Sequence, residues 1–334
     1  MVDTVLSGGW IIDGTRTPPY QADLCIQDGK IVAISPQWEG NCRTRVDVTG
    51  KIVSPGFIDI HTHSDTCPFS AVFPESKVAQ GITLEIVGNC GVSAVPILPS
   101  CQAEQTAYLR KISEIPVPEE AVRDASVQKY AAHVAQTGYP SHLGTLIGQG
   151  TLRAGIVGFQ DRPLTPSEME QMKFLLDDQL NQGALGLSLG LIYPPGSFSP
   201  TSELRELARV VQKHKKILAV HMRNEGPNIF QAVEEMLSIA EETGVHLHIS
   251  HLKLMGKAQW GQAPRLLERI EASRQRGAVV TCDQYPYTAT STILAALLPR
   301  RAYDGGSAAM LRRVSDPDTS LLRDIAEEME RRGG

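Results

Sequence analysis

The sequence predicts an α/β fold, in which a (β/α)8-type barrel follows a small β-domain. After Pro55, short apolar runs alternate with longer stretches of helical period, which is the pattern of parallel βαβ units. Histidine and cysteine side chains recur where these apolar runs end. A barrel collects the ends of its strands at one mouth. We therefore favour a barrel over a doubly wound sheet.

Residues 1–54 predict the small β-domain. Asp13-Gly14 and Asp28-Gly29 stand between short apolar runs, and Asp-Gly in that position is a strong hairpin signal. The segment contains no evident catalytic cluster. The expected strands are Thr4–Leu6, Trp10–Ile12, Asp23–Ile26, Lys30–Ile34 and Lys51–Val53.

Residues 55–334 predict the barrel, with seven of its eight strands. The expected strands cover 56–63, 82–87, 142–147, 184–189, 217–220, 247–249 and 278–281. The expected helices cover 167–182, 202–215, 228–242 and 310–332. The first of these has a cap-like opening at Thr165-Pro166-Ser167-Glu168 and a stop at Gly183.

An eighth apolar strand does not follow residue 281. A barrel without one strand has two unpaired edges, which invite self-association. We therefore expect the chain to be shorter than the architecture that it encodes.

Composition restricts the partners. The chain has 334 residues, 42% of them hydrophobic, and a formal net charge of -5. It can bury a large core, and without a basic run it gives no reason to expect nucleic acid or an anionic membrane as a partner. No apolar run approaches the 18 or so residues of a membrane helix. We expect a soluble cytoplasmic protein that acts on small molecules, with its six scattered cysteines reduced.

The first metal signal is His61-Thr62-His63, at the end of the run that begins at Pro55. Alternate residues of a strand face the same side, so the two imidazoles lie about 7 Å apart on one face. An isolated His-x-His is often an ordinary part of a strand. Its position at the end of a buried strand favours a site.

Three further candidate ligands follow other strands: Cys90 the second, His221 the fifth and His251 the sixth. Each by itself is more often structural. Together with His61 and His63 they form a set of nitrogen and sulfur ligands, which suits zinc better than magnesium or calcium. We assign His246 and His248 to packing or hydrogen bonding, since they lie below His251 on the strand, and Asp65 to a supporting or loop position.

At this point the sequence resembles a known family. Residues 55–63 are similar to the Pro-Gly-Phe-Ile-Asp-x-His-x-His motif of the amidohydrolase superfamily. A narrower resemblance is to the N-acyl-D-amino-acid deacylases, or D-aminoacylases. The segments that carry it are 88–93, 183–196, 221–225, 249–253 and 285–287, and the likeness extends to about residue 299.

This resemblance implies a metal-dependent hydrolase barrel with a β-sandwich built from both chain ends, of which residues 1–54 would be an incomplete part. It also implies hydrolysis of N-acyl-D-amino acids to a carboxylate and a D-amino acid. One tightly bound Zn²⁺ would be held by Cys90, His221 and His251, and a weaker adjacent site by His61 and His63.

The resemblance further implies that Lys253, Tyr285 and Ser291 contact the substrate, and that Tyr193 faces the same mouth. Arg223 and Lys253 also suit a substrate carboxylate physically, because both follow candidate ligands on neighbouring strands. For Arg223, surface ion pairing is an equal alternative.

The sequence departs from the family pattern in two places. Gln149 stands in Gly148-Gln149-Gly150, where the family usually has Gly-His-Gly. The catalytic aspartate that the family carries on strand eight is absent, and loss of a general base costs about 10² to 10⁴ in rate. Two alternatives therefore stay open: a catalytically impaired fragment or metal-binding remnant, and a cyclic-amide hydrolase. The absence of a lysine at the end of strand four argues against the latter.

Overall fold

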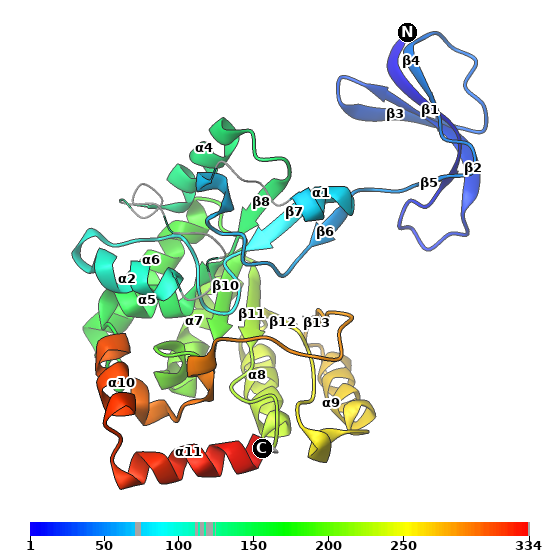
Figure 1. Cartoon of the computed structure of the whole chain (residues 1–334). Helices are drawn as coiled ribbons and strands as arrows, with labels where there is room; N and C mark the ends of the chain where they lie inside the picture. Colours follow the sequence, from blue (N-terminus) through cyan, green and yellow to red (C-terminus); the bar gives the residue numbers. More distant parts are fainter. Residues whose placement is uncertain (71–74, 111–112, 114–116, 118–122, 124, 333–334) are drawn as a thin grey trace. The chain divides into compact units, whose positions relative to one another are not determined.

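The computed structural model describes residues 1–70, 75–110, 113, 117, 123 and 125–332 (Figure 1). Its contacts divide the chain into two compact units, Met1–Phe57 and Ile58–Gly334, which are described separately. The predicted domains, 1–54 and 55–334, have their boundary close to this division. The identification of the first unit as part of a β-sandwich stays a prediction.

The first unit is a five-stranded sheet with the order β3-β2-β1-β4, in which β5 also pairs with β1. The predicted hairpin at Asp28-Gly29 is confirmed, since both residues have positive φ angles (50° and 70°) and Gln27 pairs with Lys30. β4 was not predicted, because its exposed side chains lack an apolar alternation. The strands are β1 (Val2–Ile11), β2 (Tyr20–Gln27), β3 (Lys30–Ser35), β4 (Cys42–Asp47) and β5 (Ile52–Val53).

The second unit contains the predicted barrel strands in two sheets, with the orders β6-β7-β8 and β13-β12-β11-β10-β9. The third predicted strand is divided: its first part pairs in parallel with β7 and its second part with β10. Within the described ranges, no strand follows β13. The strands are β6 (Phe57–Asp59), β7 (Ile82–Val87), β8 (His142–Thr145), β9 (Ile147–Gly148), β10 (Gly186–Gly190), β11 (Ile217–His221), β12 (His246–Ile249) and β13 (Val280–Cys282).

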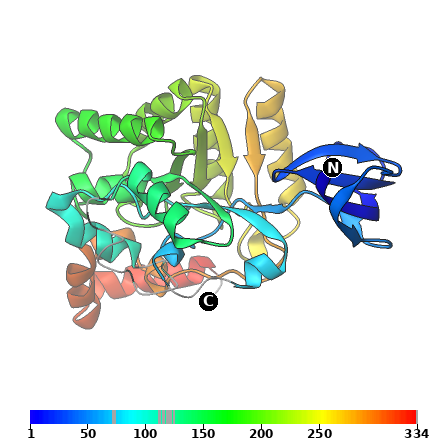
Figure 2. The same ribbon diagram turned by 90° about the horizontal axis from the view of Figure 1, so that it is seen from above.

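Helices pack against the outside of these strands, α7 on β11, α8 on β12 and α9 on β13; Figure 2 shows the green to gold helices beside the strands. The capping box predicted at Thr165 and Glu168 is present. The predicted helix 310–332 is two helices, because Pro317 cannot continue the first. The helices are α1 (Glu75–Ala79), α2 (Gln102–Leu109), α4 (Val127–Thr137), α5 (Gln149–Ile156), α6 (Pro166–Asn181), α7 (Thr201–Lys213), α8 (Ile229–Thr243), α9 (Ala263–Gln275), α10 (Gly306–Ser315) and α11 (Thr319–Arg332).

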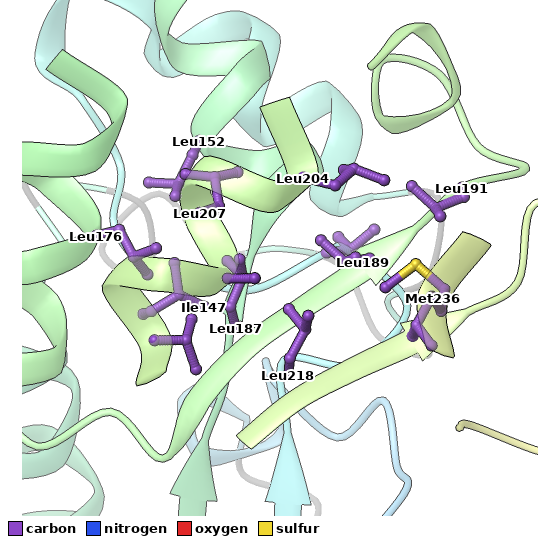
Figure 3. Packing of buried hydrophobic residues seen from close by; sticks show 14 of the residues in the cluster. Ile147, Leu152, Leu176, Leu187, Leu189, Leu191, Leu204, Leu207, Leu218 and Met236 are labelled. Atoms are coloured by element: carbon purple, nitrogen blue, oxygen red, sulfur yellow. The ribbon is translucent and has the colours of Figure 1, made fainter. Parts of the chain in front are cut away.

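β10 shows how the core and the site share one strand. Leu187 and Leu189 are fully buried among leucine, isoleucine and methionine side chains of neighbouring strands and helices (Figure 3). Ser188, between them, faces the other side, where its hydroxyl donates to the carbonyl of Gly88 and accepts from the amide of Gly91. β10 therefore anchors the loop that carries Cys90.

Candidate metal centre

Four of the five predicted ligands meet at one place. The Sγ atom of Cys90 lies 3.3 Å from His61 Nε2 and 3.7 Å from His251 Nε2. His251 Nε2 lies 2.8 Å from His221 Nδ1. The ligand atoms of His61, Cys90 and His251 are all within 4.8 Å of one another, as are those of His221, Glu225 and His251. These four side chains thus come together from the ends of β6, β7, β11 and β12 or from the loops that follow them.

Two carboxylates orient these imidazoles. Asp283 Oδ2 lies 3.1 Å from His61 Nδ1, and Glu225 Oε1 lies 3.0 Å from His251 Nδ1. When the Nδ1 atom of a neutral imidazole donates to a carboxylate, the Nε2 atom is left with its lone pair. In both histidines that Nε2 atom faces Cys90. The carboxylates therefore present nitrogen lone pairs to the same space as the sulfur.

Burial and charge oppose each other in this cluster. Burial by itself would raise the pKa of the Cys90 thiol, but the charge of His61 and hydrogen bonds from His221, His251 and His61 hold it well below its usual value. Burial would likewise raise the pKa of Glu225. The hydrogen bond to His251 and the charges of His221 and Lys253 outweigh it and lower the pKa to about 2. The site therefore favours a thiolate and an ionised carboxylate.

The backbone at two ligands is unusual. Cys90 and His251 have positive φ angles, 54° and 38°, which non-glycine residues seldom adopt and which cluster at functional sites. The loop of Cys90 also comes very close to β10. A Cβ atom on Gly190 would lie 2.0 Å from the Cys90 carbonyl oxygen, and one on Gly91 would lie 2.5 Å from the Gly190 nitrogen. Glycine at both positions lets the sulfur reach the cluster.

His63 stands apart from the four converging ligands. Its ring centroid is 5.7 Å from that of His61, and it is outside the groups whose ligand atoms lie within 4.8 Å. Its Nδ1 atom is buried without a hydrogen-bond partner. Asp65, nearby in sequence, is buried and accepts a hydrogen bond from the Gly88 amide, and its burial raises its pKa to about 6. The role of His63 as a ligand stays a prediction.

The sequence reasoning missed two residues of this centre, Glu225 and Asp283. Asp283 accepts hydrogen bonds from three groups: the His61 ring, the His248 ring (2.9 Å) and the His251 backbone amide (2.6 Å). His248 thus has a hydrogen-bonding role, as expected, although the partner was unforeseen. Both carboxylates could have been found, because each follows a strand end within four residues, as the histidines do.

The candidate substrate residues occupy different situations. Lys253 is at the cluster, with Nζ 2.5 Å from Glu225 Oε1 and 5.6 Å from the centroid of the Tyr285 ring. The Tyr285 hydroxyl is shielded from solvent and lacks a hydrogen-bond partner. The Tyr193 ring lies against His221, with centroids 4.9 Å apart, and its hydroxyl is 2.9 Å from that of Thr292. Ser291, in the same segment as Thr292, is exposed.

Arg223 points its guanidinium into the protein. It forms two hydrogen bonds with the Glu235 carboxylate, at 3.0 and 3.1 Å, and two with the backbone carbonyls of Ser197 and Ser199. This bidentate pair fixes the end of β11 to α8. The sequence left two alternatives for Arg223, substrate binding and ion pairing. The structure displays ion pairing, and the contacts of Arg223 give no support to substrate binding.

Gln149 is buried at the start of α5. Its Nε2 atom donates to Ser199 Oγ (2.7 Å) and Glu203 Oε1 (2.9 Å), and Glu203 also pairs with Arg153. The Gln149 Oε1 atom is buried without a hydrogen-bond partner. The amide therefore belongs to a buried polar network that joins α5 to α7, and as a neutral side chain it does not titrate.

Comparison with known proteins identifies the family of the chain. A family model described as "Amidohydrolase family" matches residues 44–295. The chain belongs to the amidohydrolase family. A D-aminoacylase of Alcaligenes xylosoxydans xylosoxydans is 36% identical over 292 residues, which are 87% of this chain and 59% of the relative. The chain therefore spans about three fifths of the length of this curated relative.

Solved structures of amidohydrolases extend the comparison. A crystal structure of D-aminoacylase, 36% identical, has a TM-score of 0.80 and covers 87% of this chain and 60% of its own. N-acyl-D-glutamate deacylase from Bordetella bronchiseptica was solved with zinc and a phosphonate inhibitor. It is 34% identical, with a TM-score of 0.81, and the match covers 99% of this chain and 70% of the deacylase chain. Hydantoinases at 15 to 17% identity show the fold alone. In the part of the chain that the structure describes, no helix is long and apolar enough to cross a membrane.

Proposed function

We propose that this chain carries the metal-binding and substrate-binding part of a zinc-dependent hydrolase that cleaves the amide bond of N-acyl-D-amino acids. The observation that carries the proposal is the convergence of His61, Cys90, His221 and His251 from four strands. It is supported by relatives that are themselves named D-aminoacylase and N-acyl-D-glutamate deacylase.

The cluster fits zinc. Bond lengths of about 2.0 Å to nitrogen and 2.3 Å to sulfur place the ligands of a tetrahedral zinc about 3.5 Å apart. The distances of 3.3 and 3.7 Å from Cys90 Sγ to the two Nε2 atoms are close to that value. When bound, zinc would polarise the acyl carbonyl and lower the pKa of water. A second, weaker site that includes His63 is part of the proposal.

Lys253 and Tyr285 are the residues that we propose to hold the substrate. The Lys253 ammonium stands beside His251, 2.9 Å from its Nδ1 atom, where it can pair with the carboxylate of an amino acid. The unpartnered Tyr285 hydroxyl is available as a hydrogen-bond donor. Tyr193 and Ser291 would complete the mouth.

Hydrolysis also needs a general base that accepts a proton from the attacking water. Asp283 and Glu225 are the carboxylates in contact with the cluster, and both are occupied by imidazole hydrogen bonds. Burial would raise the pKa of Asp283, yet hydrogen bonds from His248 and His61 hold it far below its usual value, so that it is a weak base at pH 7. We therefore propose neither as the general base, and expect turnover by this chain to be reduced.

The remaining proposals concern partners and location. Five of the cysteines, Cys25, Cys42, Cys90, Cys101 and Cys282, are free thiols, in keeping with a reducing, cytoplasmic location. β6 and β13 are the outer strands of their sheets, and an unpaired strand edge is a route to self-association. We propose a small-molecule substrate, without nucleic acid or membrane as a partner.

One experiment tests the proposed function. The purified chain is loaded with zinc, its metal content is measured by mass spectrometry, and hydrolysis of N-acetyl-D-amino acids, their L-enantiomers, hydantoin and dihydroorotate is followed. We expect about one tightly bound zinc and slow cleavage of the D-substrates. Bound zinc without any turnover would favour the metal-binding remnant, and cleavage of the cyclic amides alone would favour a cyclic-amide hydrolase.

A further inference from the structure

Two adjoining hollows lie beside the metal cluster, on the loops that follow β12 and β13. The first, of about 290 Å³, is lined by residues that include His251, Lys253 and Tyr285. The second, of about 400 Å³, shares Lys253 and Trp260 with the first and extends over α9 to Leu267. A substrate held at the cluster by Lys253 therefore has room to place a further group here.

The lining of the second hollow is largely apolar, and that of the first combines apolar side chains with polar ones such as Gln284, Thr288 and Thr290. The apolar side chains of the two linings include Leu252, Leu254, Met255, Trp260, Leu266 and Leu267. Among the described residues of the two linings there is no aspartate, glutamate or arginine, and Lys253 is the one with a permanent positive charge. The transfer of an apolar group of the substrate from water into these hollows is therefore favourable.

The distribution of positive charge argues against an acidic side chain in these hollows. The α-carboxylate of an N-acyl amino acid already needs Lys253, whose ammonium is also shared with Glu225. Arg223, the other candidate for binding a substrate carboxylate, is committed to Glu235. A second carboxylate, as in a glutamate or aspartate derivative, would lose water without gaining a cation, which is unfavourable.

Trp260 is the aromatic residue that the two linings share. It is 73% exposed, although it lines both hollows, and it follows the short helix η4 (Lys257–Gln259) between two glycines with positive φ, Gly256 and Gly261. A large aromatic side chain exposed next to a site offers area that a ligand can cover. Trp260 is therefore placed to contact any group that enters from the cluster.

We propose, on the basis of the proposed function, that these hollows receive an apolar group of a neutral N-acyl-D-amino acid and that Trp260 is the residue that selects for it. The chain then prefers leucine-like substrates to glutamate and aspartate derivatives. The apolar group is either the side chain or the acyl chain of the substrate, since both extend from the amide at the cluster.

The kinetic test compares three substrates of the zinc-loaded chain: N-acetylglycine, N-acetyl-D-leucine and N-butanoylglycine. We expect at least one of the two larger substrates to exceed N-acetylglycine in kcat/KM by about tenfold or more. Trp260→Ala should remove most of that gain, measured as the ratio of kcat/KM for the larger substrate to kcat/KM for N-acetylglycine. A gain with N-acetyl-D-leucine assigns the hollows to the side chain, and one with N-butanoylglycine assigns them to the acyl chain. Absence of both gains overturns the proposal.

The matched control is Phe174→Ala on α6. Phe174 is another aromatic residue with similar exposure, 72%, and it is outside both linings. We expect it to leave all three values unchanged. If it removes the gain as Trp260→Ala does, the effect is not specific to the hollows and the proposal fails.

A binding measurement separates this inference from the proposed function. The chain has three tryptophans, so Trp10→Phe combined with Trp38→Phe leaves Trp260 as the sole indole fluorophore. We expect N-acetyl-D-leucine or N-butanoylglycine to change its fluorescence saturably, at concentrations where N-acetyl-D-glutamate does not. A saturable fluorescence change without any turnover would contradict the proposed hydrolase activity, but it would support the binding of an apolar group in the hollows. Equal responses to all ligands, or none, would overturn the inference.

Discussion

Asp283→Asn is the substitution that tests the metal centre most directly. Asp283 Oδ2 accepts from two imidazoles, those of His61 and His248, while Oδ1 accepts from the His251 backbone amide. An asparagine has one carbonyl oxygen and one amino group in their place. In either orientation of the amide, the amino group of the asparagine faces at least one N–H donor, and that donor loses its hydrogen-bond acceptor.

The size of the effect follows from these contacts. The better orientation directs the oxygen to the two imidazoles and leaves the His251 amide facing another donor. Losing one hydrogen bond to a charged group and leaving its partner buried costs about 1.5–3 kcal/mol. Because the His61 tautomer is also less firmly held, we expect zinc affinity to fall by about 10–100-fold.

Two assays measure these effects. Chemical denaturation of the metal-free chain gives the free energy of unfolding, and competition with a chelator of known affinity gives the zinc dissociation constant. Asp316→Asn is the matched control, since Asp316 is exposed and distant in sequence from the cluster. If Asp283→Asn leaves both quantities within the error of the wild-type values, Asp283 does not orient His61 and the reasoning is refuted.

Three further predictions concern the metal, the pH dependence and the core. Cys90→Ala should reduce bound zinc well below one per chain in mass spectrometry, whereas Cys101→Ala should not. For Glu85, burial would raise the pKa, but hydrogen bonds from Lys77, Ser141 and Ser64 hold it below its usual value. The resulting stabilisation is complete above the unfolded pKa of about 4.3 and is lost as pH falls through the folded pKa. The stability difference between wild type and Glu85→Gln should therefore shrink from pH 6 to pH 3. Leu187→Ala should lower the free energy of unfolding by about 2–5 kcal/mol, because Leu187 is fully buried; a loss below about 1 kcal/mol would contradict its place in the core.

The strand and helix pattern could be predicted where one physical signal dominates. α6 was located within about one residue at each end, because Thr165 and Glu168 form a capping box and Gly183 follows the last turn. β4 escaped prediction, since its side chains are largely exposed and it is held by parallel pairing with β1. Pairing between distant segments leaves little trace in a short window of sequence.

The candidate ligands could be chosen from the sequence, whereas the groups that hydrogen-bond to them could not. His61, Cys90, His221 and His251 follow strand ends, and that rule placed them together. Glu225 and Asp283 obey the same rule, but the sequence cannot say which ring nitrogen a carboxylate faces. The commitment of Arg223 to Glu235 was also invisible, because it depends on side-chain direction across the gap between β11 and α8.

Charge balance links these unforeseen residues to the metal. With the imidazoles neutral, as metal binding requires, the Cys90 thiolate and the Asp283 and Glu225 carboxylates bring three negative charges to a buried cluster, and Lys253 supplies one positive charge. Buried charges of one sign repel each other and lose hydration, so an excess of two negative charges is costly unless a cation offsets it. A divalent ion at the four ligands supplies the missing charge. Zinc should therefore stabilise the folded chain. A neutral molecule in the place of the metal would leave the charge of the two carboxylates unbalanced.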